Sequence, residues 1–391
     1  MRILITLTPP LDPTTGGVQM STVKLSRMLA PFGHEIHVFS FAQDGNVDQP
    51  TCTVAGAPAP GGVSEPRNLQ ALAAQIDQFR PDVIINQMPY EHPIGAVLQQ
   101  YPIPRLACLR NTLYSVKNNL DQYAARSLPG PLVPFGKTAL GHKLLLARHK
   151  RKHAADLRRI LATYDRFVMF AEPNLNELRF FVPEFDPGAI ALIPNSIPDV
   201  APELPEKENR LLWLGRVTRT QKRADLILPL WAKLSARLPD WQFDVVGDGD
   251  LVAPLRREAA QKGIPRITFH GKQVSEPFFR KSAVFVMTSE FEGFPNTLVE
   301  AQSRGAVPVV FDSYPMAGWL VRDGQDGALV PTGDLAATEA AIMDLCTSQE
   351  KRAAMAQAAL NSAARFTQAR VAQQWQSLLE EVAPRAQVAA Q

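Results

Sequence analysis

Short apolar runs bounded by Gly, Pro or Asn alternate with segments of helix length along most of the chain. This alternation is typical of βαβ units, in which buried parallel strands read as apolar runs and helices connect them. In the first half the pattern predicts strands over 2–7, 34–41, 52–57, 82–87, 105–110, 166–171 and 189–194. It predicts helices over 18–30, 67–79, 140–162 and 172–181. The first half is therefore expected to form one mostly parallel sheet.

The same pattern occurs again beyond residue 208. Strands are predicted over 210–214, 242–247, 267–270, 283–288, 307–311 and 328–330. Helices are predicted over 223–238, 250–262, 297–304 and 335–347. A last helix over 366–382 carries Val371, Trp375 and Leu378 on one face, and the alanine-rich tail after Pro384 is expected to be frayed.

A stretch rich in proline and glutamate separates the two halves, from Pro194 to Glu208. Prolines withhold the backbone donors that a sheet needs, and 391 residues are many for one hydrophobic core. We therefore predict an α/β protein with two Rossmann-like domains. The predicted parts are a first domain, a linker, a second domain and a crossover helix with its tail, over 1–197, 198–207, 208–365 and 366–391. Because such folds bind ligands at the carboxyl ends of their strands, both sheets are expected to face one cleft.

The composition is that of a globular protein, with 46% hydrophobic and 20% charged residues. A formal net charge of +3 is too small for a dedicated nucleic-acid binder. The three cysteines are widely spaced, which argues against a disulfide framework and against a CxxC metal site. The chain shows neither a signal-peptide pattern nor an apolar stretch of about 20 residues, so we expect a cytoplasmic protein.

The most informative segment is SEFEGFPNTLVEA, over 289–301, which follows the apolar strand predicted at 283–288. Glu292 and Glu300 stand eight positions apart in it, one in a loop and one within the following helix. Pro295 suits the first turn of that helix, which would leave the N–H groups of Asn296, Thr297 and Leu298 free to bind an anion. Two carboxylates beside such a site would suit the hydroxyl groups of a sugar and a ribose.

The stretch EGFPNTLVE resembles the E-x7-E element of family 4 glycosyltransferases, which have the two-domain GT-B fold. The resemblance extends over most of the chain. It implies that Glu292 contacts the donor sugar, that Glu300 contacts the ribose, and that Gly293 and Phe294 lie in the donor site. It also implies that the C-terminal domain binds a nucleotide-sugar, that the N-terminal domain binds the acceptor, and that the last helix returns to the N-terminal domain.

Two cations stand after the predicted strand at 210–214, in LLWLGRVTRTQKRADLIL. Two fixed cations are a natural means of stabilising a departing diphosphate without a metal. Arg216 and Lys222 resemble the GR…K pair of the family, although the spacing is one residue longer than in its commonest form. Lys222 is therefore preferred over its neighbour Arg223.

Glycine loops provide further donor-site candidates. Gly16 and Gly17 resemble the family's GG loop, which closes on the donor, and glycines of this kind let the backbone approach a ligand closely. VVGDGD resembles the family's nucleotide-side turn, which implies that Gly247 and Gly249 matter for backbone shape. Asp248 and Asp250 are expected to cap the next helix rather than bind a metal. The following loop sits where the family binds the base, which implies main-chain contacts from Lys272 and Val274.

The chain departs from the family at RLACLRNTLYS, over 105–115. Many members have a histidine at this strand end, whereas this sequence has Arg110-Asn111. Some members that act on polysaccharide or glycolipid precursors look similar, so Arg110 is predicted to contact the donor sugar or the acceptor. His92 is the alternative for the missing histidine, although a lone loop histidine is more often structural or solvated.

Positive charge gathers around 140–161. The segment contains, or lies next to, Lys137, Lys143, Arg148, His149, Lys150, Arg151, Lys152, His153, Arg158 and Arg159. Together with Leu144, Leu145, Leu146 and Phe135 they could hold the domain on an anionic membrane surface. A solvated helix face is the competing interpretation, and the sequence does not choose between them.

These observations favour a retaining, metal-independent glycosyltransferase that needs no cofactor and acts in cell-surface polysaccharide synthesis. Its substrates would be a nucleotide-sugar and a saccharide or lipid-linked acceptor. The resemblance to the family implies a UDP-sugar as the donor, with a GDP-sugar as the alternative. The protein would be cytoplasmic, and it would lie at the inner face of the membrane if the basic segment binds lipid. The rival hypotheses are a catalytically silent scaffold in an assembly complex, a phosphorylase-like use of the fold, and a nicotinamide oxidoreductase, for which the dinucleotide fingerprint is missing.

Overall fold

The computed structural model describes residues 1–197 and 203–389, with side chains described as far as Ala383. Part of the predicted linker, 198–202, lies outside the described residues. The chain divides into two compact domains, one of Met1–Ser196 with the residues from Gln368 onward, and one of Ile197–Thr367. Residues 203–207 of the predicted linker belong to the second domain, where Leu204 packs on the core and Lys207 Nζ donates to Phe279 O at 2.9 Å.

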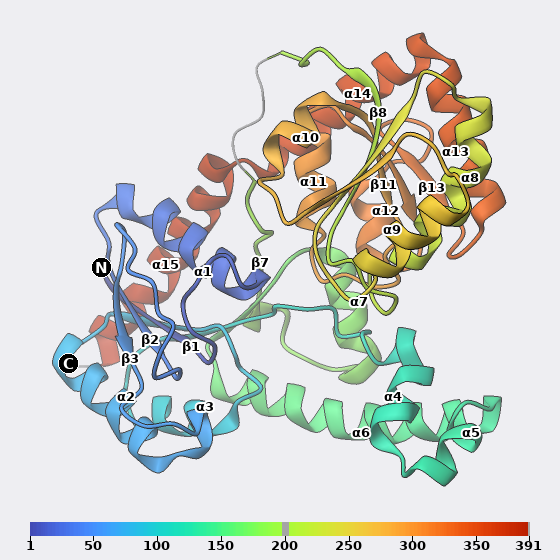
Figure 1. Ribbon diagram of the computed structural model, residues 1–391. Helices are drawn as coiled ribbons and strands as arrows, with labels where there is room; N and C mark the ends of the chain where they lie inside the picture. The colour runs from blue at the N-terminus through green and yellow to red at the C-terminus, as the bar shows by residue number, and fades with distance from the viewer. Residues whose placement is uncertain (198–202, 390–391) are drawn as a thin grey trace. The chain divides into compact units, whose positions relative to one another are not determined.

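The first domain is built on a seven-stranded parallel sheet (Figure 1). In chain order the strands are β1 (Arg2–Leu7), β2 (Glu35–Ser40), β3 (Thr53–Gly56), β4 (Val83–Asn86), β5 (Arg105–Cys108), β6 (Arg166–Met169) and β7 (Ile190–Leu192). Their order in the sheet is β3-β2-β1-β4-β5-β6-β7. All seven strands were predicted, but β5 and β6 end two residues earlier than the apolar runs indicated.

The helices of the first domain include three that the sequence pattern missed. The helices are α1 (Gly17–Leu29), α2 (Pro66–Phe79), α3 (His92–Leu98), α4 (Leu120–Ser127), α5 (Val133–Gly136), α6 (Ala139–Thr163), α7 (Glu172–Phe181) and α15 (Gln368–Ala389). The missed helices α3, α4 and α5 are short, and α3 and α5 have a proline in their first turn, so their sequences resemble loops.

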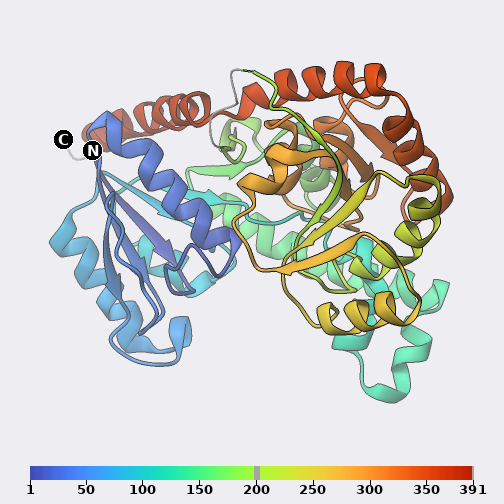
Figure 2. The ribbon, with the colours of Figure 1, turned by 45° about the horizontal axis from the view of Figure 1, so that its top comes forward.

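The C-terminal helix completes the first domain. α15 lies against α1 (Figures 1 and 2), and Val371, Trp375 and Leu378 are buried in the same core as β1, which confirms the predicted face. His34 Nε2 also lies 2.6 Å from Gln376 Oε1. The expectation of a frayed tail after Pro384 is wrong as far as Ala389, because the helix continues to that residue.

The second domain has a six-stranded parallel sheet in the order β10-β9-β8-β11-β12-β13. The strands are β8 (Glu208–Leu214), β9 (Gln242–Val246), β10 (Ile267–Gly271), β11 (Ser282–Met287), β12 (Val307–Phe311) and β13 (Ala328–Val330). The helices are α8 (Ile227–Arg237), α9 (Val252–Gln261), α10 (Glu276–Lys281), α11 (Asn296–Gln302), α12 (Pro315–Leu320), α13 (Leu335–Thr347) and α14 (Gln349–Ala363). The sequence pattern missed α10, α12 and α14.

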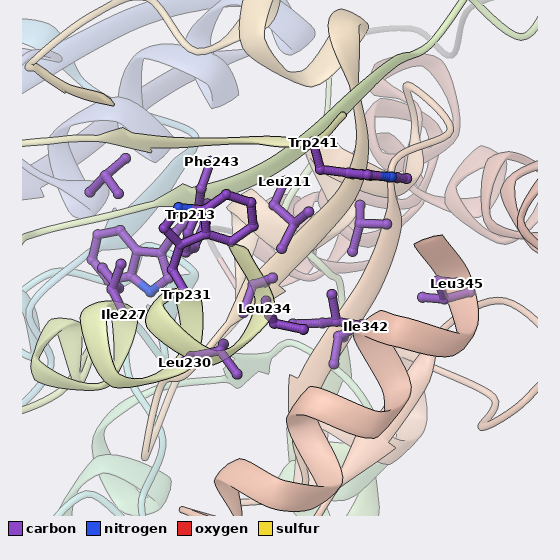
Figure 3. Close-up of a cluster of buried hydrophobic side chains, with 14 of the residues drawn as sticks. Leu211, Trp213, Ile227, Leu230, Trp231, Leu234, Trp241, Phe243, Ile342 and Leu345 are labelled. Atoms are coloured by element: carbon purple, nitrogen blue, oxygen red, sulfur yellow. The ribbon is translucent and has the colours of Figure 1, made fainter. Parts of the chain in front are cut away.

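Large aromatic side chains fill the core of the second domain (Figure 3). Trp231 and Phe243 pack with ring centroids 5.5 Å apart. Buried indole N–H groups need acceptors, and Trp231 Nε1 donates to Pro265 O at 2.7 Å while Trp213 Nε1 donates to Thr288 Oγ1 at 2.9 Å. The second bond ties the core to the loop that follows β11.

Candidate active site

In each sheet the strand order reverses beside one strand, and open α/β sheets bind ligands at the carboxyl ends of the strands at such a point. In the second domain this point lies between β8 and β11. The loop after β8 carries Arg216 and Lys222, and the loop after β11 carries Glu292. The two loops are joined, because Glu290 N donates to Gln221 O at 2.9 Å and Gln221 Nε2 donates to Phe291 O at 3.0 Å.

The structure brings Lys222 and Glu292 together. Lys222 Nζ lies 2.7 Å from Glu292 Oε1, and the two side chains are only 16% and 10% exposed. Gln221 Nε2 donates to the second oxygen, Glu292 Oε2, at 3.3 Å. Below the pair, Thr288 Oγ1 donates to Lys222 O at 2.8 Å. The ion pair is therefore fixed to the core by a chain of hydrogen bonds that ends at Trp213.

The neighbouring cations have different surroundings. Arg223 has a φ of 50° and donates to Asp225 and Glu290, and these hydrogen bonds, that to Asp225 foremost, raise its pKa. Arg223 is thus occupied in holding the two loops together. Arg216, by contrast, is exposed. The side chain of Lys222 covers Gly215, where an added Cβ would lie 3.3 Å from the Lys222 Cδ and Cε atoms.

Two glycines permit close backbone contacts beside the cations. Gly247 has a φ of 134°, and a Cβ there would lie 1.9 Å from Gly215 O. At Gly249, with a φ of 157°, a Cβ would lie 2.4 Å from Val217 O. Gly215 N donates to Val246 O at 3.1 Å and Gly247 N donates to Gly271 O at 2.8 Å. The loops after β8, β9 and β10 are therefore held to one another by their backbones.

The aspartates next to these glycines do not have the expected role. α9 begins without a side-chain cap, so the prediction that Asp248 and Asp250 cap it is wrong. Asp248 Oδ1 instead accepts from Gly249 N at 2.8 Å, which fixes the tight turn. Within the described residues, no group of three His, Cys, Asp or Glu side chains is arranged to hold a metal ion. The predicted base-binding loop is open, with Lys272 exposed and Val274 75% exposed.

The start of α11 also differs from expectation. Pro295 precedes the helix, Asn296 N donates to Phe294 O at 2.9 Å, and Leu298 N donates to Pro295 O at 3.0 Å. The prediction that these N–H groups are free for an anion is therefore wrong for Asn296 and Leu298. Thr297 Oγ1 is buried and has no hydrogen-bond partner among the residues described.

The remaining residues of this motif differ in exposure. Gly293 and Phe294 are buried, and the Phe294 ring packs edge-on against Phe366 with centroids 5.5 Å apart. Glu300 is half-buried. The loop that carries Glu292 is thus anchored through its aromatic residue.

In the first domain the strand order reverses between β1 and β4. Gly16 and Gly17 stand at the start of α1, with Gly16 in an extended conformation as the residue before the helix. A cavity of about 340 Å³ lies at the same end of the sheet, and its lining includes Val18, Gln87 and Arg110. Burial lowers the pKa of Arg110, and its Nε donates to Gln87 Oε1.

His92 does not line this cavity. It begins α3, where its Nε2 lies 3.0 Å from Asp156 Oδ1, and it lines a separate cavity of about 190 Å³. The arrangement favours a structural role for His92 and leaves Arg110 as the candidate at this strand end.

Two family models match the chain. Residues 15–201 match the model described as Glycosyltransferase Family 4, and residues 199–362 match the model described as Glycosyl transferases group 1. Between them the models cover both domains. The chain belongs to the family 4 glycosyltransferases.

Relatives of this family 4 glycosyltransferase include the amylovoran biosynthesis glycosyltransferase AmsD of Erwinia amylovora. AmsD is 29% identical over 176 residues, which are 44% of this chain and 48% of AmsD. A second relative is an α-1,4-N-acetyl-D-galactosaminyltransferase of Campylobacter jejuni, and its name includes a PP-undecaprenol-linked saccharide. It is 26% identical over 179 residues, which are 45% of this chain and 49% of the relative. The chain thus spans about half the length of these curated relatives.

A solved structure shows the same GT-B fold. HepE of Anabaena in complex with UDP-glucose has a TM-score of 0.70 to this family 4 glycosyltransferase, at 18% identity, over 97% of this chain and 100% of HepE. Among the described residues, no helix is both long and apolar enough to cross a bilayer.

The basic segment of this family 4 glycosyltransferase is less cationic than its sequence indicated. Burial lowers the pKa of His149, and lowers that of His153 to about 4, so both rings are neutral near pH 7. The Lys150 ammonium lies over the ring of Phe180, 4.2 Å from its centroid. Leu145 is buried, so it is wrong to include it in an exposed apolar surface.

Sequence reasoning missed several polar residues of the two sites in this family 4 glycosyltransferase. Gln221 donates to Glu292 and Gln87 accepts from Arg110, yet neither glutamine was named as a candidate, although Gln221 lies within the quoted segment 211–228. Their position directly after or between motif residues was the available signal: Gln221 precedes Lys222, and Gln87 follows the strand β4. His153 lines the first-domain cavity from α6, which no local pattern indicated.

Proposed function

We propose that the chain is a retaining glycosyltransferase that moves a hexose or N-acetylhexosamine from a UDP-sugar to a saccharide or lipid-linked acceptor. Its context would be the synthesis of cell-surface polysaccharide. The Lys222–Glu292 pair at the switch point of the second sheet carries the proposal, and exposed Arg216 lies on the same loop as Lys222. Membership of family 4 and the name of AmsD support the transfer and its context, and the UDP-glucose complex of HepE supports the donor.

The chemistry follows from the charges in the second domain. The bond between the anomeric carbon and the diphosphate breaks, and the diphosphate leaves with its electron pair and gains negative charge. Lys222 and Arg216 would stabilise that charge in place of a metal ion. The acceptor hydroxyl enters on the same face of the sugar and passes its proton to the departing phosphate oxygen, which retains the anomeric configuration.

The two carboxylates would hold the donor on either side of the diphosphate. Glu292 accepts hydrogen bonds from the hydroxyl groups of the donor sugar and Glu300 from those of the ribose. In the structure Glu292 forms an ion pair with Lys222. When the donor binds, the Lys222 ammonium would interact less with the Glu292 carboxylate and more with the diphosphate.

Release of nucleoside diphosphate from a panel of UDP- and GDP-sugars tests this function. The assay is run with and without EDTA, in the presence of membrane extract as acceptor, on the wild type and on the Glu292→Ala, Glu300→Ala double variant. We expect one UDP-sugar to be turned over in EDTA and the variant to be inactive. Turnover that EDTA abolishes would contradict the metal-free mechanism. Turnover of no donor would favour the scaffold hypothesis instead.

We further propose that the first domain docks on an anionic membrane surface through the corner formed by α5 and α6. Four of the nine exposed large hydrophobic side chains among the described residues lie within this corner, namely Leu132, Phe135, Leu140 and Leu144. α5 packs on the start of α6 (Figure 1). Exposed Lys137 and Lys143 lie in the same stretch, and each basic residue near an anionic bilayer contributes about 1 kcal/mol.

Sedimentation with vesicles tests the docking. Leu140 and Leu144 are 59% and 55% exposed, so their replacement by serine removes apolar surface without disturbing the core. We expect the double variant to bind phosphatidylglycerol vesicles about ten-fold more weakly than the wild type. Val274→Ser, at an exposed apolar residue of the second domain, serves as the control. Equal binding by the wild type and the double variant would contradict the proposal.

A further inference from the structure

The 340 Å³ cavity of the first domain is lined by polar side chains that have no part in the proposed transfer chemistry of the second domain. It is formed by the loops that follow β4 and β5, with Val18 of α1 and His153 of α6. Figure 1 labels the two helices. It lies where the order of strands reverses between β1 and β4. A cavity of a few hundred Å³ at such a point is a typical ligand site.

The cavity contains a cation without a counter-ion. Arg110 is half-buried, and its Nε donates to the neutral amide oxygen of Gln87. Among residues 1–197 and 203–389, no carboxylate forms an ion pair with Arg110. Burial lowers the pKa of the guanidinium, as expected for a charge that water solvates poorly. The guanidinium also interacts with the thiol of Cys108, another residue of the lining, whose own pKa is raised by burial. A guanidinium has five N–H donors, so those that Gln87 and Cys108 do not use are left for a ligand.

A second donor stands beside it. Gln87 is 1% exposed, and its Nε2 has no hydrogen-bond partner in the described part of the chain. The amide oxygen is already occupied by Arg110, which makes the orphaned atom the NH₂ group. Leaving a buried donor unpaired is costly, so an acceptor group on a ligand at this place would satisfy Gln87 Nε2.

The other polar groups of the lining do not neutralise Arg110. The Oδ1 atom of Asn111 accepts from Thr112 N at 2.8 Å. His153 is neutral, since burial lowers its pKa to about 4, and its Nε2 has no partner among the described residues. Glu91 is the one carboxylate among the described lining residues, and it lies beyond ion-pair distance from Arg110.

We propose that this cavity binds an oxyanion carried by a saccharide, either the carboxylate of a uronic acid or a phosphate group on a sugar. Arg110 would hold two oxygens of the anion with its planar fork, and Gln87 Nε2 would donate to one of them. This inference rests on the proposed function, because it assigns an acidic saccharide to the substrates of the same protein. It gives Arg110 a role in selecting the substrate.

Equilibrium binding measured by saturation-transfer NMR tests the inference without requiring turnover. The probes are glucuronate, glucose 6-phosphate, glucose and inorganic phosphate. We expect at least one of the two acidic sugars to bind about ten-fold or more tightly than glucose, since a charge-assisted bidentate contact is lost with the neutral sugar. Preference for glucuronate would identify a uronic acid, and preference for glucose 6-phosphate would identify a phosphorylated saccharide.

Two variants connect the preference to the cavity. Arg110→Gln should abolish it, and Arg110→Lys, which keeps the charge but loses the fork, should weaken it about ten-fold. Arg67→Gln, at an exposed arginine on α2 of the same domain, should leave it unchanged. Unchanged melting temperatures would show that the variants are folded.

Several outcomes would overturn the inference. They are equal binding of glucose and both acidic sugars, no binding of either acidic sugar, binding of inorganic phosphate as tight as that of the sugars, and an acid preference that survives Arg110→Gln. Because no donor is present, these outcomes are independent of the proposed transfer. If the protein releases diphosphate but its cavity shows no preference for acidic sugars, only this inference is refuted. If the cavity prefers acidic sugars but no diphosphate is released, only the proposed function is refuted.

Discussion

Replacing Lys222 with alanine is the most direct test of the charge arrangement in the second domain. The ammonium lies 2.7 Å from Glu292 Oε1, and both side chains are nearly buried, so solvent screens them only in part. An ammonium about 4 Å from a phosphoryl oxygen contributes about 4 kcal/mol at an effective dielectric constant of about 20. Lengthening the Lys222–Glu292 contact from 2.7 Å to about 3.3 Å as the ammonium turns to the diphosphate would offset about 1 kcal/mol of this at the same dielectric constant. The remaining 3 kcal/mol, roughly, correspond to about a hundred-fold in kcat.

The assay is the initial rate of nucleoside diphosphate release at varied donor concentration, which separates kcat from KM. A loss mainly in kcat indicates an interaction made in the transition state, whereas a loss mainly in KM indicates one made equally in the bound donor. Arg219→Ala is the matched control, because Arg219 is an exposed cation of the same loop. A folded Lys222→Ala protein with kcat within about three-fold of the wild type would refute the reasoning, as would an equal loss in Arg219→Ala.

Three further predictions concern stability. Gly247→Ala should lower the melting temperature, measured by calorimetry, far more than Gly263→Ala. A Cβ at Gly247 would lie 1.9 Å from a carbonyl oxygen, whereas one at Gly263 would have no atom within 4 Å. Similar losses in the two variants would contradict this. His153 has a folded pKa of about 4, below its usual 6.5, so the unfolded state binds the extra proton and stability is lost as pH falls from about 6.5 to 4. His153→Phe should make melting temperature less dependent on pH in that window, and an unchanged slope would count against a buried neutral ring. Trp375→Ala should destabilise the first domain by about 3–5 kcal/mol, seen as faster proteolysis of that domain, and wild-type resistance would be inconsistent with burial of the indole.

The strands could be predicted from the sequence because each is a buried parallel strand that reads as an apolar run. β11 is buried at every position, for example, and it was expected at almost the same residues. Helix α14 was missed because Gln349–Ala363 is rich in alanine. Its polar and apolar faces therefore differ little, and it lacks the periodic pattern from which helices were predicted. The short helices α3 and α12 were missed because prolines at their starts resemble loops.

The site was predictable at the level of which loops carry it, and less so at the level of atoms. Motif residues Lys222 and Glu292 lie on loops that the sheet topology brings together, but their ion pair depends on the path of both loops. The bonds of Asn296 N and Leu298 N could not be foreseen, since they depend on whether Pro295 lies inside or before the helix. The neutrality of His153 likewise depends on tertiary burial.

The connection of the chain between its domains has a consequence for biosynthesis. The chain leaves the first domain after Ser196 and returns to it at Gln368, so residues that complete its core, such as Val371 and Leu379, are synthesised only after the second domain. During translation the whole second domain would emerge from the ribosome before the core of the first domain could be completed. Premature termination within α15 would therefore leave the first domain, rather than the second, with an exposed core.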